Sequence, residues 1–216
     1  MRAASGVPVV IVVMGVSGAG KTTVGKLLAQ RLGLPYLEAD DLHPAANRAK
    51  MASGHALTDE DREPWLRALA DWIRQVTDSG RGGVMACSAL KREYRDLLRQ
   101  AGAGVWFLHL ELDPASAAER VDRRAGHFMP PGLEGSQYAT LEPLRPDEPG
   151  MTVDATADPR SIVDEAARAV PGSGTNRSVP GLDRAVDTGG HENLRTECTN
   201  MPTVRRGELR TGTAHG

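Results

Sequence analysis

Apolar and polar positions alternate in blocks along residues 7–170, and each block fits a buried strand or an amphipathic helix. Residues 7–14 are apolar throughout and rich in β-branched side chains, which is typical of a central parallel strand covered on both faces. Residues 21–32 have apolar positions at helical spacing, and Gly33 is suited to end that helix. The pattern predicts further strands at residues 35–39, 84–87, 105–112 and 151–154.

Helical patterns separate these strands. Thr58 and Asp61 resemble a capping box at the start of a long helix. Its apolar stripe comprises Trp65, Leu66, Leu69, Trp72, Ile73 and Val76. Shorter helices are expected at 45–51, 90–100, 114–124, 136–141 and 159–170, with a loop at 126–135. The alternation predicts a three-layer α/β sandwich with a central parallel sheet of five strands.

A basic helix is expected at residues 90–100. Of its arginines, we expect Arg95 and Arg99 on the solvated face, as for most charged residues of a surface helix. After residue 170 the composition changes: residues 171–216 are rich in Gly, Ser, Thr and Arg and have no sustained apolar period. We therefore predict one domain at 1–170 and a disordered C-terminal tail at 171–216.

Charge and cysteine content narrow the function classes. The formal net charge is −2, which gives no reason to expect a nucleic-acid or membrane partner. Cys87 lies in an apolar run and Cys198 in a polar one, so a disulfide is not expected and a reducing compartment is favoured. With no apolar run long enough to span a bilayer and no signal-peptide pattern, we expect a soluble, cytoplasmic protein.

The residues after the first strand form the pattern of a phosphate-binding loop, G-x-x-x-x-G-K-[ST]. Strand, glycine-rich loop and helix follow one another in the order that a phosphate cradle requires. Lys21 is expected to reach the β- and γ-phosphates of ATP, and the Thr22 hydroxyl to ligate Mg²⁺. The loop residues are Gly15, Val16, Ser17, Gly18, Ala19, Gly20, Lys21 and Thr22.

Several classes of nucleotide-binding protein share such a loop. A regulatory GTPase needs a guanine-reading Asn-Lys-x-Asp motif, which this sequence lacks. A mechanical ATPase usually has a long apolar strand that ends in acidic residues, whereas the strand here ends in Cys87 and Ser88. A small-molecule kinase needs the loop, an acceptor pocket, a base and cations over the transferred group. The sequence offers all four, so a small-molecule kinase is the favoured class.

Candidate acceptor residues follow the predicted second and third strands. Cations there suggest an anionic acceptor, and carboxylates suggest hydroxyl groups to orient or deprotonate, so a small polyhydroxy acid suits both. Asp40 and Asp41 have the alternative role of capping a loop. The candidates are Asp40, Asp41, His43, Arg48, Lys50, Ser88, Lys91 and Arg92.

A second group of cations precedes the Gly/Pro-rich loop. Arg120, Arg123, Arg124 and His127 suit a lid that closes over ATP and brings charge to its phosphates. Arg120 and Arg124 are four residues apart and share one face of a helix. The alternative is an ordinary basic helix end that complements the helix dipole.

Together these segments resemble the gluconokinases of the phosphate-loop kinase superfamily. The resemblance covers about residues 9–170 and rests on several segments in family order. They are residues 14–22, Asp40-Asp41-Leu42-His43-Pro44, residues 50–54, residues 57–62, Pro64-Trp65-Leu66, residues 87–92, residues 94–99, residues 126–129 and residues 136–144.

The resemblance implies a fold and an activity. The fold would be that of the phosphate-loop nucleoside-monophosphate kinases, with the phosphate-loop strand central and a mobile lid at about 124–142. The activity would be transfer of the ATP γ-phosphoryl group to the 6-hydroxyl of D-gluconate, with Mg²⁺, in a protein that is a homodimer. Another small-acid kinase, such as a shikimate kinase, a nucleotide kinase and a non-catalytic ATP-binding regulator remain alternatives.

The resemblance also assigns roles to single residues. Asp40 would lie beside the acceptor and serve as its base, while Lys21 and Arg124 would act on the phosphates. Arg120 would lie along the adenine. The gluconate-binding residues would be Asp40, His43, Arg48, Ser88, Lys91, Arg92 and His127.

Overall fold

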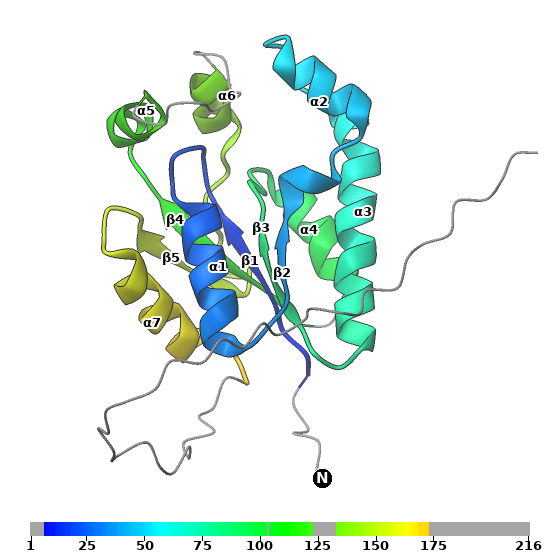
Figure 1. The fold of residues 1–216 in the computed structure, drawn as a ribbon, viewed down its shortest axis with the longest axis vertical. Helices are drawn as coiled ribbons and strands as arrows, with labels where there is room; N and C mark the ends of the chain where they lie inside the picture. The colour runs from blue at the N-terminus through cyan, green and yellow to red at the C-terminus, as the bar shows by residue number, and fades with distance from the viewer. Residues whose placement is uncertain (1–6, 103, 123–132, 173–216) are drawn as a thin grey trace, which may run out of the picture. The chain divides into compact units, whose positions relative to one another are not determined.

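The computed structural model describes residues 7–102, 104–122 and 133–172. Its five strands form one parallel sheet in the order β2-β3-β1-β4-β5, with the phosphate-loop strand in the centre (Figure 1). Within this part of the chain the predicted three-layer α/β architecture is confirmed. The strands are β1 (Val10–Met14), β2 (Tyr36–Glu38), β3 (Gly83–Ala86), β4 (Val105–Glu111) and β5 (Gly150–Asp154).

Helices cover both faces of the sheet because successive β1 residues point to opposite sides. Ile11 and Val13 pack on the side of α1 and α7, whereas Val10, Val12 and Met14 pack on the side of α3 and α4. All five side chains are buried, as the unbroken apolar pattern predicts. The helical elements are α1 (Lys21–Leu32), η1 (Ala39–Leu42), α2 (Ala45–Ala52), α3 (Asp59–Asp78), α4 (Arg92–Gln100), α5 (Pro114–Asp122), α6 (Leu133–Thr140) and α7 (Pro159–Ala169).

Local signals fix several helix ends. Gly33 ends α1 with a left-handed φ of 65°, as predicted. The predicted capping box of α3 is confirmed: the Asp61 amide donates to Thr58 Oγ1, and the Thr58 amide donates to the Asp61 carboxylate. The helix α4 begins two residues later than predicted, because Ala89 adopts a φ of 45° and Lys91 is extended.

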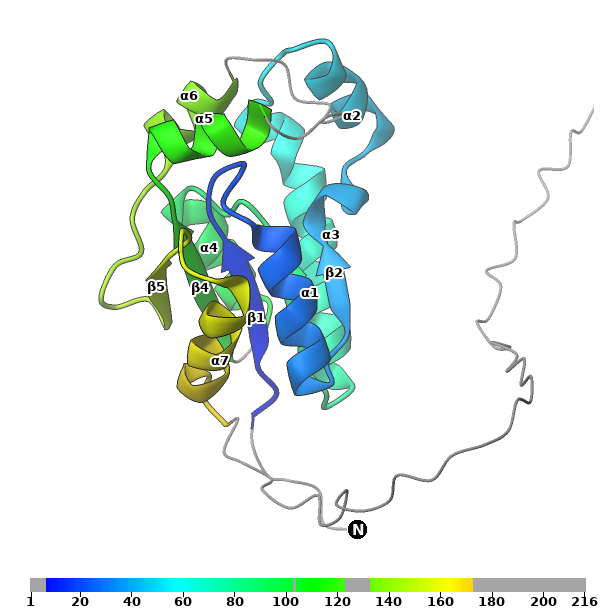
Figure 2. The ribbon, with the colours of Figure 1, turned by 60° about the vertical axis from the view of Figure 1, so that its left-hand side comes forward.

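The predicted loop at residues 126–135 is wrong for its last part. Residues 126–132 lie outside the described chain, but α6 already begins at Leu133. Contacts with α5 and a hydrogen bond from Tyr138 to the Leu112 carbonyl hold α6 over the carboxyl ends of the strands (Figure 2). Such tertiary contacts override the weak helical preference of a glycine-containing segment.

Two further sequence predictions concern the C-terminal tail and membrane-spanning segments. The predicted tail at residues 171–216 falls almost entirely outside the described residues, which end at Gly172. No helix in the described part of the chain is long and apolar enough to cross a membrane.

Candidate active site

The phosphate loop joins the end of β1 to the first turn of α1. Gly15, Gly18 and Gly20 have φ angles of 140°, 81° and 92°, a region that residues with side chains rarely adopt. A Cβ atom at Gly15 would lie 2.7 Å from the Leu110 carbonyl oxygen, and one at Gly18 would lie 3.0 Å from that of Ala117. The glycines therefore serve both the curvature of the loop and its close packing against β4 and α5.

The two polar residues that begin α1 have defined partners. Lys21 Nζ donates a hydrogen bond of 2.9 Å to the Val16 carbonyl, so its ammonium group lies over the loop. Thr22 Oγ1 donates to Glu38 Oε2 at 2.9 Å, and the Tyr36 hydroxyl donates to the same oxygen at 2.7 Å. Burial, together with the hydrogen bond to Glu38, raises the pKa of Tyr36, which keeps it a donor.

Glu38 is a site residue that the sequence analysis missed. The available signal is a carboxylate at the carboxyl end of a short strand, two residues before Asp40. No group of three or more His, Cys, Asp or Glu residues within the described ranges could hold a metal. Mg²⁺ at phosphate-transfer sites uses only one or two protein ligands besides water and phosphate, so Thr22 and Glu38 together fit this ion.

The end of β3 lies beside the phosphate loop. The Gly15 amide donates to the Ser88 carbonyl at 3.3 Å. Burial raises the pKa of the Cys87 thiol to about 12, and the charges of Asp40, Lys21 and Glu38 also act on this thiol. Asp40 lies two residues after Glu38, whose carboxylate accepts the Thr22 hydroxyl of the phosphate loop. The ends of β2 and β3 thus both adjoin this loop.

Asp40 and Asp41 both lie in η1, the short helical turn that follows β2. The side chains of both are exposed. The Asp40 carbonyl accepts the His43 amide at 3.3 Å, which closes the turn. An exposed carboxylate at the carboxyl edge of the sheet is accessible to a substrate hydroxyl.

His43 is buried at the same edge, with 6% of its surface exposed, and stacks on Trp65 with ring centroids 4.4 Å apart. Trp65 is held in turn by a bond from its Nε1 to the Ala39 carbonyl at 2.7 Å. Burial, with the charges of Arg62 and Arg48, lowers the pKa of His43 to about 4, so the ring is neutral at pH 7. Among the described residues, His43 Nδ1 has no hydrogen-bond partner.

The basic residues of α2 have different surroundings. Arg48 Nη1 donates to the His43 carbonyl at 2.6 Å, and the Arg48 side chain is otherwise exposed. Lys50 Nζ pairs with the Asp61 carboxylate at 2.5 Å, and the buried Asn47 amide donates to the Asp61 carbonyl at 2.6 Å. Lys50 thus ties α2 to the start of α3, whereas Arg48 remains beside the acceptor edge.

Lys91 and Arg92, at the start of α4, are engaged in ion pairs. Lys91 Nζ lies 2.8 Å from an Asp59 carboxylate oxygen and 3.1 Å from Glu93. Arg92 binds Asp147 through both terminal nitrogens, at 3.1 and 2.5 Å. Either residue would have to exchange these partners to bind an acidic acceptor.

The burial of Arg95 contradicts the sequence prediction for this residue. It was expected on a solvated face, but it is fully buried and is bound by Glu148, which is 5% exposed. Nε and Nη2 donate to the two Glu148 oxygens at 2.6 and 2.9 Å. Nη1 donates to the carbonyls of Ala89, Leu90 and Glu142 at 3.2, 3.1 and 3.1 Å. One side chain therefore joins the loop after β3 to the segment after α6.

Arg120 bridges the phosphate loop and the loop after β5. Nη1 donates to the Gly18 carbonyl at 3.4 Å, and Nη2 donates to the Ala155 carbonyl at 3.0 Å. This position adjoins the loop and fits a role in nucleotide binding. The predicted residues Arg123, Arg124 and His127 lie outside the described chain, so their roles remain predictions.

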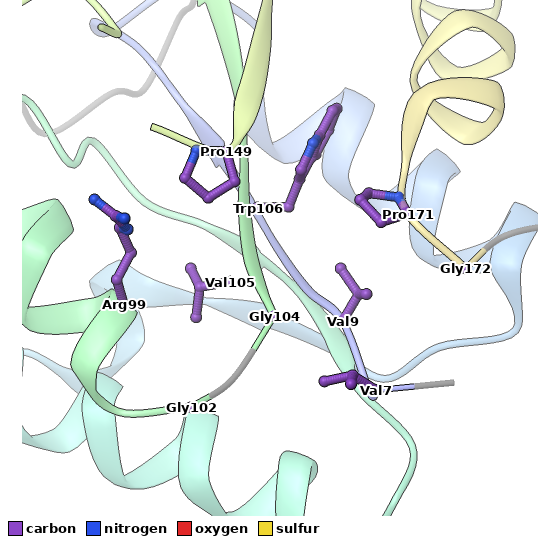
Figure 3. Close-up of a pocket in the computed structure, with 10 residues that line it drawn as sticks. All are labelled: Val7, Val9, Arg99, Gly102, Gly104, Val105, Trp106, Pro149, Pro171 and Gly172. Carbon is purple, nitrogen blue, oxygen red and sulfur yellow. The ribbon is translucent and has the colours of Figure 1, made fainter. Parts of the chain in front are cut away.

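A cavity of about 400 Å³ lies at the opposite edge of the sheet, at the amino ends of the strands (Figure 3). Its lining is mainly apolar and includes Val9, Val105 and Trp106, with Arg99 as the charged residue among those that line it. None of the predicted site residues contributes to it. The candidate active site is therefore the cluster around the phosphate loop.

Comparisons with known proteins identify relatives of this chain. The shikimate kinase family profile matches residues 17–142. A gluconokinase from Gluconobacter oxydans is 48% identical over 161 residues, which is 74% of this chain and 90% of the relative. The thermosensitive gluconokinase of Escherichia coli is 41% identical, over 77% of this chain and 89% of the relative. A solved gluconokinase from Sinorhizobium meliloti has a TM-score of 0.67 at 43% identity, covering 77% of this chain and 92% of that one.

Proposed function

Because the chain belongs to the gluconokinase family, we propose that it transfers the γ-phosphoryl group of ATP to the 6-hydroxyl of D-gluconate, giving 6-phospho-D-gluconate and ADP. One observation carries the proposal on the structural side. Thr22, in the phosphate loop, is hydrogen-bonded at 2.9 Å to Glu38, which lies two residues before the exposed carboxylate of Asp40. Donor cradle and acceptor carboxylate thus share one edge of the sheet.

On the donor side, the loop amides and the N-terminus of α1 bind phosphate oxygens. Lys21 supplies a positive charge at the transferring group, and Arg120 and Arg124 add to it or hold the nucleotide. Thr22 and Glu38 would hold Mg²⁺, which neutralises charge on the β- and γ-phosphates when bound. ATP and Mg²⁺ follow from the family and the fit of these residues.

On the acceptor side, Asp40 is the proposed base. The proton of the 6-hydroxyl passes to the Asp40 carboxylate as the oxygen forms its bond to the γ-phosphorus. The bond between that phosphorus and the bridging oxygen breaks, and ADP leaves with the electron pair. Asp40 contributes by position, because phosphoryl transfer depends more on alignment and charge than on strong base catalysis.

Recognition of gluconate is assigned to the surrounding polar residues. His43 suits a sugar hydroxyl, since its neutral ring carries a buried nitrogen that has no partner among the described residues. The substrate carboxylate suits a cation, and Arg48, Lys91, Arg92 and His127 are the candidates. Ser88, beside the loop, completes the proposed set.

A second candidate is a kinase for another small acid. The shikimate kinase profile matches a segment that carries most of the loop and all of the proposed acceptor residues, which favours this class over a nucleotide kinase or a regulator without turnover. A coupled assay with ATP, Mg²⁺ and a panel of gluconate, related aldonates, shikimate and nucleoside monophosphates separates these possibilities. Turnover that is much faster with shikimate or a nucleotide would overturn the proposal, and ATP binding without any transfer would favour a regulator.

Asp40→Asn tests the proposed base. We expect kcat to fall by about 100-fold or more while ATP affinity changes little, because the carboxylate touches the acceptor. Asp41→Asn is the matched control, since Asp41 is the exposed neighbour in the same turn. A kcat for Asp40→Asn that equals that of the unmodified protein would remove Asp40 from the reaction.

A cytoplasmic location and a homodimer also remain predictions, testable by fractionation and by light scattering.

A further inference from the structure

An uncharged side chain hydrogen-bonds to a backbone amide of the phosphate loop. The Ser17 amide donates to Gln137 Oε1 at 2.7 Å, across 120 positions of the sequence. The amide oxygen is the acceptor of a glutamine side chain, so the orientation of Gln137 follows from this bond. Gln137 lies in α6, which stands over the loop between β1 and α1 in both ribbon views (Figures 1 and 2).

The contact is held by fixed neighbours. Tyr138, the next residue, donates through its hydroxyl to the Leu112 carbonyl at 2.8 Å. The Leu141 amide donates to the Gln137 carbonyl at 2.8 Å, and the Glu142 amide donates to the Leu90 carbonyl at 2.9 Å. Gln137 is itself partly buried. Its bond to Ser17 is therefore part of the packing of α6 and not a loose surface contact.

The amides of a phosphate loop are arranged for oxygen anions. A neutral amide oxygen satisfies such a donor less strongly than a charged phosphate oxygen does. On the basis of the proposed nucleotide site, we propose that Gln137 is a displaceable stand-in for a phosphate oxygen at the Ser17 amide. In the nucleotide-free protein it preserves the shape of the loop, and a nucleotide competes with it for this amide.

Displacement of Gln137 from the Ser17 amide would affect the acceptor side of the site through neighbouring hydrogen bonds. Glu142 lies just beyond the end of α6, five residues after Gln137. Its carboxylate accepts a hydrogen bond of 2.8 Å from the backbone amide of Arg92. The Glu142 carbonyl also accepts Arg95 Nη1 at 3.1 Å. Release of Gln137 thus acts on the segment that holds the start of α4, where Lys91 and Arg92 lie. Gln137 is accordingly a positioning residue that reports the state of the phosphate loop.

The test measures binding of AMP-PNP, with Mg²⁺ in excess, to the full chain by calorimetry. Gln137→Ala removes the competitor, so we expect binding to become about three- to tenfold tighter, the range of one net hydrogen bond. Gln137→Glu places a charged acceptor at the same amide and opposes phosphate, so binding should weaken by about tenfold or more. The matched control, Gln100→Ala, changes an exposed glutamine at the end of α4 and should leave affinity unchanged.

The opposite directions of the two Gln137 variants are diagnostic, because general damage to α6 would weaken binding in both. In an NMR spectrum of the nucleotide-free protein, the chemical shift of the Ser17 backbone amide should also change in Gln137→Ala. Affinity that is unchanged or weaker in Gln137→Ala would overturn the inference while leaving the proposed function intact. Absence of AMP-PNP binding by the unmodified protein would instead overturn the proposed nucleotide site.

Discussion

Removing one member of the buried pair of Arg95 and Glu148 should destabilise the fold strongly. In Glu148→Gln the arginine keeps its carbonyl partners but loses its counter-charge in a fully buried position. Removing one partner of such a pair costs about 3–5 kcal/mol, because an uncompensated charge is left away from water. Burial alone would raise the pKa of Glu148. The hydrogen bonds from Arg95 and from the Arg145 backbone amide outweigh this effect and lower the pKa, which favours the ionised carboxylate.

Urea unfolding followed by circular dichroism measures this loss. For a domain of this size each kcal/mol corresponds to about 2–4 °C, so the melting temperature should also fall by about 6–20 °C. Glu63→Gln is the control, since its partner Arg67 is on the same exposed helix surface, and such pairs contribute about 0.3–0.5 kcal/mol. If Glu148→Gln costs no more than Glu63→Gln, the buried pair does not stabilise the fold and the reasoning fails.

Three further predictions follow from single residues. The pKa of His43 is about 4 in the folded protein and 6.5 in the unfolded chain, so the unfolded chain binds more protons between these pH values. The free energy of unfolding should therefore be highest above pH 6.5 and should fall as the pH is lowered. Between pH 7 and pH 5 unfolding titrations should show about 2 kcal/mol of this loss, absent in His43→Asn but retained in the exposed control His55→Asn. Lys21→Ala should lower kcat in the coupled assay by about 100-fold or more, since it removes charge at the phosphates, and near-normal kcat would contradict the loop assignment. Thr58→Ala should cost about 1 kcal/mol in a urea titration, because it breaks the capping box of α3, and no change would show that the cap is not stabilising.

Residues with local signals were predicted well from the sequence. The phosphate loop, the left-handed Gly33 and the Thr58 capping box each depend on neighbours within a few positions, so their patterns are visible in the chain. The central position of β1 also follows from its apolar character on both faces.

Residues whose partners are distant in sequence could not be predicted in this way. Arg95 looks like any surface arginine of a basic helix, and the counter-charge that allows its burial comes from Glu148, 53 positions away. Gln137 and Ser17 are further apart still, and a glutamine has no pattern that marks it for a loop amide. Glu38 was missed because a short strand that ends in a carboxylate is common. Its role becomes visible only in the structure, where Thr22 and Tyr36 both donate hydrogen bonds to its carboxylate.

The central place of β1 has a consequence for how the chain folds during synthesis. Val10 pairs with Gly83 and with Val105, so both neighbours of the first strand are made long after it. At about 5–20 residues per second, the ribosome leaves this apolar strand without partners for several seconds. Pairings of high contact order also form slowly. The strand that leads into the nucleotide cradle is therefore made well before either neighbour that pairs with it, so Val10–Met14 needs protection from aggregation until both have been made.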